Sequence, residues 1–364
     1  MKNKKILIIC TSLNMGGAEK KSVWLANQLS KDFMVYFFSL KSSGVLSENL
    51  NNDVIIKNFN LVRSKNIFSK LYYVFVGWFR LVKTIKDEEI KVVISFLFHS
   101  NLYAKLAQIF SSHKFNHIIA VRSDRLSKRG SNQNFFRMII FKYFIVDKSS
   151  KIVFNSKEGQ KRFGIKKEYN QKVIYNSPEN DPDFNLKKTQ KFVFVGRLDE
   201  LKNTTELVKS ISHLNRTGHT IELDIYGKGP NYIFLKNYIS NNNLTNSVYL
   251  RGLDPSISNK LSTYQALILT STHEGFPNVL IEAMNAKINC ISTKVGDVPY
   301  LFNENRGILI DGFDYLSISR ALESFLKLEK ATKDKIIKNA HEFVRKNLNE
   351  EDILNEWLLL INQG

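Results

Sequence analysis

The segment Glu274–Met284, EGFPNVLIEAM, decides the fold class of this chain. An apolar run, Ala266–Leu269, ends shortly before it, and an apolar, helix-forming run follows Pro277. Because proline favours the first turn of a helix, the pattern predicts a strand, a short loop and a helix that begins at Pro277. Glu274 then lies in the loop, and Glu282 lies about one turn inside the helix. Ligands of open α/β sheets bind at that edge, and free N–H groups of a helix start attract anions. The segment can therefore hold a phosphate with its backbone and sugar hydroxyls with its two carboxylates.

Apolar runs alternate with amphipathic stretches along the whole chain, in two successive halves separated by the polar stretch Asn176–Gln190. Alternating strands and helices predict a parallel sheet with right-handed crossovers in each half. A chain of 364 residues also exceeds what one hydrophobic core usually supports. We therefore predict an α/β protein with two doubly wound, Rossmann-like domains, residues 1–180 and 190–349, that face one another across a cleft. The expected strands are 5–10, 34–40, 54–56, 91–98, 117–121, 151–154, 172–175, 191–195, 220–226, 248–250, 266–270 and 288–292, and helices 101–110 and 258–264 are among the connections.

A second motif, VGRLDELKN at Val195–Asn203, ends the first strand of the second half. Arg197 and Lys202 are placed to meet a diphosphate, the arginine as a planar fork and the lysine as a point charge. Taken alone, two cations in such a loop favour surface ion pairs. Beside the two carboxylates of Glu274–Met284 they favour an anion site.

Both motifs resemble glycosyltransferase family 4, the retaining nucleotide-sugar transferases with the GT-B fold. EGFPNVLIEAM is similar to the family's E-x7-E signature, and VGRLDELKN is similar to its V-G-R-L-x(4)-K element. The resemblance implies that Glu274 holds hydroxyls of the donor sugar and that Glu282 holds the ribose hydroxyls. It also implies that Arg197, Lys202 and the backbone of Pro277–Val279 hold the diphosphate, whose charge grows in the transition state. The final helix, within 350–364, resembles the family's return segment, which packs on the first domain.

The first half carries looser matches to the same family. Gly16 and Gly17 in NMGGAE allow a ligand to approach the backbone closely, and the element resembles the family's first glycine-rich loop. His99, expected at the carboxyl end of a strand, matches a histidine that the family often has near the donor sugar, although a lone histidine is as often structural. The predicted catalytic residues are Glu274, Arg197, Lys202 and His99; the predicted donor-binding residues are Gly16, Gly17, Gly227, Gly229, Leu253, Glu274, Gly275, Phe276, Pro277, Asn278, Val279 and Glu282; the predicted acceptor-side residues are Glu19 and Arg122.

Positive charge is concentrated in one half of the chain, which carries a net charge of +19 overall. Residues 1–188 hold 33 Lys+Arg and 14 Asp+Glu, whereas the remainder holds 20 of each. In the stretches 63–86 and 122–142, cations alternate with large aromatic side chains, which favours helices that lie on an anionic membrane. The alternative is a buried core helix with solvated lysines. We expect no nucleic acid as partner, because the basic stretches lack RNA-type aromatic motifs.

The sequence also restricts where the protein works. No run approaches the roughly 20 apolar residues of a spanning helix. The basic N-terminus imitates a signal peptide, but its apolar core is too short and no cleavage site follows. Cys10 and Cys290 lie in or beside apolar runs as small core residues, which suits a reducing cytoplasm. We expect a cytoplasmic protein that is peripheral at the inner face of the plasma membrane.

These features predict a retaining, metal-independent glycosyltransferase of cell-surface polysaccharide biosynthesis, of O-antigen or capsule type. It would transfer a hexose or N-acetylhexosamine from a nucleotide-sugar, a UDP-sugar, to a glycan acceptor that is lipid-linked. No cofactor besides the donor and no metal is expected, since no His/Cys cluster has zinc spacing. The alternatives are a GT-B sugar-nucleotide epimerase or phosphorylase, and a nucleic-acid-binding protein that uses the basic charge.

Overall fold

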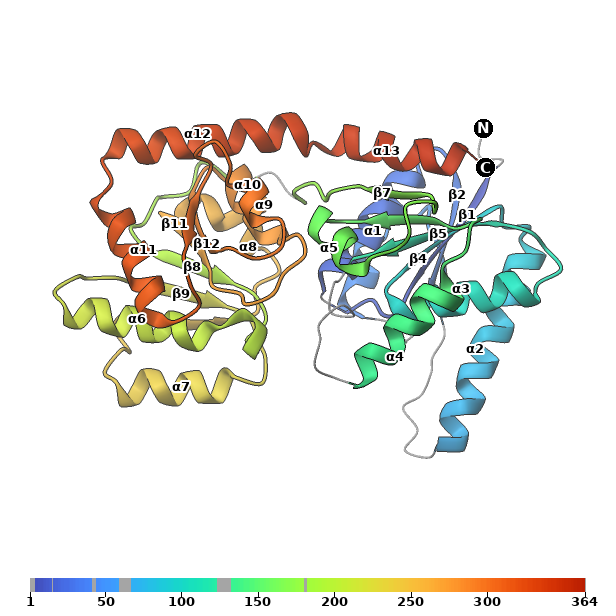
Figure 1. Cartoon of the computed structure of the whole chain (residues 1–364), viewed down its shortest axis with the longest axis horizontal. Helices are drawn as coiled ribbons and strands as arrows, with labels where there is room; N and C mark the ends of the chain where they lie inside the picture. The colour runs from blue at the N-terminus through green and yellow to red at the C-terminus, as the bar shows by residue number, and fades with distance from the viewer. Residues whose placement is uncertain are drawn as a thin grey trace. The chain divides into compact units, whose positions relative to one another are not determined.

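The computed structural model describes residues 4–14, 16–40, 44–58, 67–122, 132–179 and 182–363, which form two compact units. The N-terminal unit comprises Met1–Tyr175 and Ile353–Gly364, and the C-terminal unit comprises Asn176–Asp352. The chain therefore passes between the units twice. Strands and helices alternate within each unit (Figure 1).

The N-terminal unit is built on a parallel sheet. Its strands are β1 (Lys5–Cys10), β2 (Met34–Ser39), β3 (Ile55–Asn58), β4 (Val92–Phe96), β5 (Asn116–Val121), β6 (Lys151–Phe154) and β7 (Gln171–Val173). Among the described residues this sheet has seven strands in the order β3-β2-β1-β4-β5-β6-β7. The strand order reverses between β1 and β4, which are neighbours. Both strands are buried along their length because continuous Ile, Leu and Val runs suit a sheet covered on both faces.

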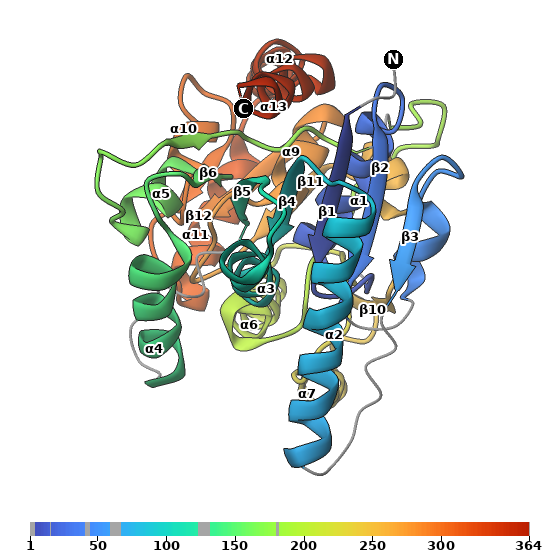
Figure 2. The same cartoon turned by 90° about the vertical axis from the view of Figure 1, so that its right-hand side faces the viewer.

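Helices and short helical turns connect these strands. They are α1 (Gly17–Leu29), η1 (Val45–Asn49), α2 (Ile67–Asp87), α3 (Phe98–Phe110), α4 (Asn132–Ile140), η3 (Phe141–Ile145) and α5 (Lys157–Phe163). The first half of α2 extends beyond the layers of its unit in both views (Figures 1 and 2). Large aromatic side chains lie exposed on α2, on α4 and on η3: Tyr72, Phe75, Phe79, Phe135, Phe136, Tyr143 and Phe144. These side chains are therefore outside the core of the unit.

The last helix, α13 (Glu350–Asn362), packs against the N-terminal unit. Its Trp357 is buried and stacks on Phe96, with ring centroids 6.3 Å apart. The ammonium groups of Lys4 and Lys151 donate to the carbonyls of Ile361 (2.7 Å) and Leu360 (2.8 Å). These carbonyls belong to the last turn of α13, where the helix dipole is negative and cations are favourable. Two lysines and one tryptophan thus fix the end of the chain.

The C-terminal unit contains a second parallel sheet. Its strands are β8 (Phe192–Val195), β9 (Leu223–Tyr226), β10 (Val248–Gly252), β11 (Ala266–Leu269), β12 (Asn289–Thr293) and β13 (Ile308–Ile310). Its helices and turns are η4 (Glu200–Lys202), α6 (Thr204–Arg216), α7 (Tyr232–Asn241), α8 (Ile257–Lys260), η5 (Leu261–Thr263), α9 (Asn278–Asn285), α10 (Val298–Leu301), α11 (Tyr315–Lys327) and α12 (Lys330–Asn347). The strand order is β10-β9-β8-β11-β12-β13, so that it reverses between β8 and β11.

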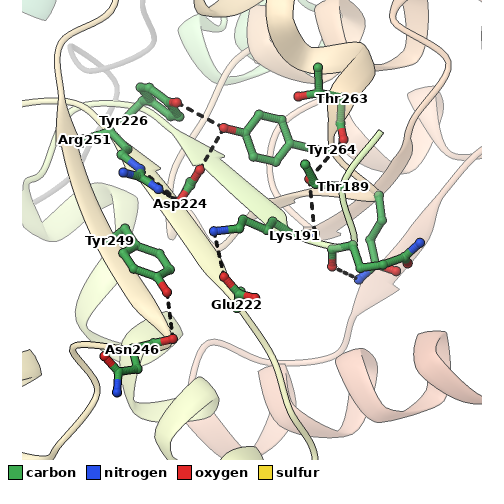
Figure 3. A network of polar contacts seen from close by, with 12 residues as sticks. Thr189, Lys191, Glu222, Asp224, Tyr226, Asn246, Tyr249, Arg251, Thr263 and Tyr264 are labelled. Atoms are coloured by element: carbon green, nitrogen blue, oxygen red, sulfur yellow. Dashed lines mark hydrogen bonds and ion pairs between the residues drawn. The ribbon is translucent and has the colours of Figure 1, made fainter. Parts of the chain in front are cut away.

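A polar network crosses β9 and β10 of this sheet and ends at Tyr264, two residues before β11 (Figure 3). The buried carboxylate of Asp224 accepts hydrogen bonds from Arg251 (3.0 Å) and from the hydroxyl of Tyr264 (2.9 Å). Burial first, and then the hydroxyl of Tyr226 and the Asp224 carboxylate, raise the pKa of Tyr264. Because a buried carboxylate is costly unless it is paired, this arrangement ties Tyr264, just before β11, to Asp224 of β9.

Several expected elements have other bounds in the structure, and three helices are among them. The third helix begins at Phe98 rather than Asn101, because the strand before it ends at Phe96 and the chain turns at once. Pro277 precedes the first residue of α9 as its N-cap instead of occupying the first helical position. The expected helix 258–264 is a short α-helix followed by η5, so that the helical segment ends before Tyr264.

Candidate functional site

The C-terminal unit brings its two sequence motifs together. VGRLDELKN follows β8 and EGFPNVLIEAM follows β11, and these strands are neighbours at the point where the strand order reverses. In open α/β sheets this switch point forms a crevice at the carboxyl ends of the strands. Hydrogen bonds join the two loops: the Thr270 hydroxyl donates to the carbonyl of Lys202 (3.0 Å), and the Thr272 N–H donates to that of Leu201 (2.8 Å). The threonines therefore fix η4 against the end of β11.

Lys202 and Glu274 form an ion pair, although they are 72 residues apart in sequence. The side chains are 20% and 15% exposed, so that the pair is shielded but reachable from solvent. Asp199 caps η4 by accepting the N–H of Lys202, and the Ser271 hydroxyl donates to Glu274 Oε1 at 2.7 Å. The ammonium and the carboxylate are thus held in place before any ligand arrives. Sequence reasoning missed Ser271 and the two threonines, although TST at 270–272 directly precedes the motif.

Arg197 lies in the same loop but is held less firmly. Its side chain is 59% exposed, and its Nε lies 3.4 Å from a carboxylate oxygen of Asp199. An exposed ion pair of this length holds a guanidinium only weakly. Arg197 can therefore turn toward an anion that binds near Lys202.

The glycines of this unit allow loops to pack backbone against backbone. A Cβ at Gly227 (φ 150°) would overlap the carbonyl oxygen of Gly196, and one at Gly229 would overlap that of Leu198. Similarly, a Cβ at Gly296 would overlap the carbonyl of Gly275. The loops after β8, β9, β11 and β12 consequently meet closely at one edge of the sheet. Gly227 and Gly229 were predicted to contact the donor. In the structure, this close packing explains why glycine occupies both positions.

The start of α9 presents backbone N–H groups at the same edge. Pro277 provides no side chain cap, and Phe276 and Pro277 are buried beneath the turn. Asn278, the first helical residue, accepts a hydrogen bond from the amide of Asn176 at 2.7 Å. Asn176 is also the first residue of the C-terminal unit, and its role was missed because 102 residues separate it from Asn278. Gly275, Val279 and Glu282 are partly exposed along this turn and helix, and Leu253 is exposed after β10.

A second edge, in the N-terminal unit, carries the other predicted residues. β1 and β4 are neighbours at its switch point, and the hydroxyls of Thr11 and Ser100 lie 3.2 Å apart across the two loops. Gly16 caps α1 and Gly17 begins it, and a Cβ at Gly16 would clash with the Glu19 carboxylate. His99 is exposed and lies in the first turn of α3, not directly at the end of a strand as we expected, because β4 already ends at Phe96. Met15 of this loop lies outside the described residues.

Arg122 contacts two aromatic rings and a backbone carbonyl of its own unit. Its guanidinium lies 5.7 Å from the ring centroid of Phe96 and 5.1 Å from that of Trp357, and it donates to the carbonyl of Ile174 at 3.1 Å. Burial lowers the pKa of Arg122 to about 9. These contacts link the end of β5 to α13.

Two kinds of feature are absent from the described residues. These residues contain no group of three or more His, Cys, Asp or Glu side chains arranged to hold a metal ion. Within the same residues, no helix has the length and apolarity needed to cross a membrane.

Comparison with known families identifies the C-terminal unit. The sequence model of the family described as Glycosyl transferases group 1 matches residues 176–343, nearly the whole of that unit. Sequence similarity to one relative extends over 98% of the chain and therefore includes the N-terminal unit. Residues 176–343 belong to the group 1 glycosyltransferases. The family predicted from the E-x7-E and V-G-R-L-x(4)-K motifs is thereby confirmed.

Two relatives of this glycosyltransferase are named for transfer of N-acetylhexosamines to polymeric or undecaprenol-linked acceptors. A Campylobacter jejuni α-1,4-N-acetyl-D-galactosaminyltransferase, named for a GalNAc-containing undecaprenol-diphosphate glycan, is 27% identical over 360 residues, covering 98% of each chain. A Staphylococcus aureus poly(ribitol-phosphate) α-N-acetylglucosaminyltransferase is 24% identical and covers 90% of this chain and 66% of its own.

Solved structures of low sequence identity share the fold. Anabaena HepE, solved in complex with UDP-glucose, gives a TM-score of 0.80 at 18% identity and covers 99% of this chain and all of its own. WaaG, a glycosyltransferase of lipopolysaccharide biosynthesis, gives a TM-score of 0.77 at 13% identity with similar coverage. The GT-B fold predicted for this glycosyltransferase is therefore confirmed.

Proposed function

We propose that this glycosyltransferase transfers an N-acetylhexosamine or hexose from a UDP-sugar to a lipid-linked glycan, with retention and without a metal ion. The observation that carries the proposal is the Lys202–Glu274 pair at the β8–β11 switch point, beside the start of α9. One site then offers a fixed cation, a carboxylate and backbone N–H groups. A nucleoside diphosphate-sugar needs all three: cation and amides for the diphosphate, and the carboxylate for sugar hydroxyls.

The roles of the side chains are those that the resemblance to the family implies, and their positions support them. Lys202 and Arg197 bind the diphosphate, and the exposed Arg197 moves to it from Asp199. Glu274 holds Lys202 before binding and accepts hydroxyls of the sugar afterwards. Glu282, about one turn into α9, reaches the ribose. On the N-terminal unit, Gly16, Gly17 and His99 serve the donor and its sugar, and Glu19 serves the acceptor side.

The reaction balances without an enzyme nucleophile. The bond between the anomeric carbon and the phosphate oxygen breaks, and the acceptor hydroxyl attacks the same face of that carbon. The acceptor's proton passes to the leaving phosphate oxygen, so that UDP leaves. Lys202, Arg197 and the α9 amides stabilise the charge that develops on the diphosphate, and this is the largest expected contribution to the rate. Glu274 is already engaged by Lys202 and Ser271, which suits binding better than attack.

The acceptor and location are inferred from chemistry and charge. The names of the relatives specify α-linked products and polymer or undecaprenol-diphosphate acceptors. An α product from an α-linked UDP-sugar requires retention. A lipid-linked acceptor places the enzyme at the cytoplasmic face of the plasma membrane, where the basic residues 1–188 and the exposed aromatics of α2, α4 and η3 meet anionic lipid.

The test is a transfer assay with UDP-GalNAc, UDP-GlcNAc and UDP-glucose, each with an undecaprenyl-diphosphate-linked glycan, in the presence and absence of EDTA. We expect UDP release that requires the acceptor, persists in EDTA and yields an α-linked product by NMR. Release of sugar 1-phosphate would indicate a phosphorylase, and isomerisation of the donor sugar without UDP release would indicate an epimerase. Loss of turnover in EDTA that added Mg²⁺ restores would overturn metal independence.

A further inference from the structure

A buried chain of polar side chains lies beneath the site edge of the N-terminal unit, and the proposed mechanism does not use it. Ser95 of β4, Asn101 of α3 and His117 of β5 are each at most 2% exposed. The Ser95 hydroxyl lies 2.8 Å from Nε2 of His117. Polar groups in a parallel sheet core are costly, since they must leave water. We therefore expect this series of buried polar side chains to have a specific structural role.

The hydrogen bonds of Asn101 indicate that role. With its amide nitrogen directed at these acceptors, Asn101 donates to Ser95 Oγ (2.8 Å), to the Ser95 carbonyl (2.8 Å) and to the Leu97 carbonyl (3.3 Å). The backbone N–H of Asn101 also donates to the Leu97 carbonyl at 3.0 Å. One buried amide thus binds both carbonyls at the end of β4.

Leu97, which this amide holds, has a strained backbone. Its φ is 71° and its ψ 159°, a conformation that side-chain-bearing residues rarely adopt. Such strain persists only where the surroundings over-determine it, and it concentrates at functional sites. Here the strained residue ends β4 and starts the turn that carries His99 and Ser100. Ser100 in turn contacts Thr11, in the loop that leads to Gly16.

We propose that Ser95, Asn101 and His117 are positioning residues that lock the Leu97 turn and thereby place His99 for glycosyl transfer. The three side chains form an ordered series from the core to the edge of the sheet. His117 orients the hydroxyl of Ser95, which is hydrogen-bonded to Asn101. The amide of Asn101 in turn holds the backbone of the Leu97 turn. None of them touches substrate. The inference rests on the proposed function only in the role that it gives to His99.

The ring of His117 works in this series as a neutral group. Burial, with a further contribution from Lys105, lowers its pKa to about 3, whereas the nearby Asp147 acts in the opposite direction. Lys105 and Asp147 pair with each other, and Ser149 and Ser150 donate to the Asp147 carboxylate. The pair neutralises the charge around His117 and leaves its ring free to hydrogen-bond with Ser95.

The test compares Ser95→Ala with a matched control, Ser30→Ala. Both serines are buried in the N-terminal unit, but the hydroxyl of Ser30 donates to the Asn27 carbonyl at the end of α1. Hydrogen exchange of the intact protein is measured first, because it does not depend on activity. We expect Ser95→Ala and Asn101→Ala to speed exchange at the amides of residues 97–100 and Ser30→Ala to leave it unchanged. Equal exchange at these amides in Ser95→Ala and the wild type would overturn the inference.

A double-mutant cycle then tests the connection to His99. We expect Ser95→Ala to lower kcat about tenfold, since small misplacements of a catalytic group are costly, and to leave UDP affinity by calorimetry unchanged. In a His99→Ala background the same change should have no further effect, because its target is gone. If the two substitutions lower kcat independently, the fold-losses multiply in the double variant. This result would overturn the inference, because it is what a merely structural role of Ser95 predicts. Wild-type turnover in His99→Ala would instead overturn the role proposed for His99, and the exchange experiment keeps the two failures distinct. Should Asn101→Ala fail to fold, Ser95→Ala, which removes a single oxygen atom, carries both measurements.

Discussion

Lys202 shows how a single residue depends on its neighbours for its chemistry. A lysine on an exposed loop would spread its ammonium over many positions, whereas Lys202 is paired with Glu274 and its turn is bonded to Thr270 and Thr272. The cation is therefore held in place without a ligand, and in the proposed mechanism little reorganisation remains for the reaction step.

We predict that Lys202→Met lowers kcat by about 10²–10³-fold, since one pre-organised electrostatic contact to the leaving group is lost. The matched control is Lys209→Met, which also removes an ion-paired lysine of the C-terminal unit, the partner of Glu206 in α6. The control should retain turnover. Steady-state kinetics with saturating donor measure both, and wild-type-like kcat in Lys202→Met would remove that residue from the mechanism.

Gly227 gives a residue-scale prediction about stability. Gly227→Ala combines a strained φ of 150° with a Cβ that overlaps the Gly196 carbonyl. Gly218→Ala is the control, with a φ of 97° and open space around the new atom. We expect the control to lower the free energy of unfolding by about 1 kcal/mol, and Gly227→Ala to lower it by about 2 kcal/mol more, since two loops must separate. Urea unfolding followed by circular dichroism measures both; equal losses would contradict the backbone contact.

The buried His117 predicts a pH dependence. Its pKa is about 3 in the folded protein, against about 6.5 in an unfolded chain. Between these values only the unfolded state binds the proton, so that the stability contributed by neutral His117 is complete above pH 6.5 and declines as the pH falls toward 3. From pH 7 to pH 5 one such group costs about 2 kcal/mol.

His117→Gln isolates this contribution. We expect the wild type to lose about 2 kcal/mol more than the variant between pH 7 and pH 5. Trp24, Trp78 and Trp357 are the chain's three tryptophans and all belong to the N-terminal unit, so that their fluorescence reports the unfolding of that unit. Parallel pH profiles for the two proteins would show that His117 is protonated in the folded state.

At the scale of elements, α13 shows how a terminal helix is fixed. Trp357 packs against Phe96 and the guanidinium of Arg122, while Lys4 and Lys151 bind the carbonyls of the last turn of α13. The hydrophobic contact supplies most of the free energy, and the cations determine where the helix ends.

We predict that Trp357→Ala lowers the free energy of unfolding by about 3–5 kcal/mol, as is usual for a large buried aromatic. On the same helix, Leu359→Ala removes a side chain that is 57% exposed and should change stability by less than about 0.5 kcal/mol. Urea unfolding followed by circular dichroism compares them. Similar losses in both variants would mean that α13 contributes through its backbone and not through Trp357.

For the whole molecule, charge is divided unequally along the chain. Residues 1–188 carry the whole excess of cations, and residues 189–364 are balanced. The exposed aromatics of α2, α4 and η3 belong to the basic part. Aromatic rings and cations in one unit suit an anionic lipid surface, where rings enter the headgroup layer.

We expect the protein to sediment with anionic vesicles, to do so much less with neutral ones, and to be released by salt. Replacing Phe75 and Phe79 of α2 by serine should reduce sedimentation. The matched control replaces Ile233 and Phe234, an equally exposed apolar pair on α7 of the neutral unit. Equal binding to both vesicle types, or equal effects of the two double variants, would refute a membrane face on α2.

Patterns short enough to lie within one element were readable from the sequence. Continuous apolar runs identified buried parallel strands, and the motifs at Val195–Asn203 and Glu274–Met284 identified the family. Prediction from local sequence was wrong where the chain turns without a glycine or proline to mark the turn. His99 was expected at a strand end, but Leu97, a leucine and not a glycine, adopts the positive φ that starts α3 early.

What the sequence by itself determined is therefore the fold class, the repetition of a parallel sheet in each half and the motifs that indicate the family. Only the tertiary structure decided which residues meet: Lys202 with Glu274, Asn176 with Asn278, and Arg122 with Trp357. The physical reason is that hydrophobic periodicity is a local property, set by the pitch of one helix or strand. Pairing across 72 or 102 residues depends on the order in which strands assemble, and that order places β8 beside β11 and β1 beside β4.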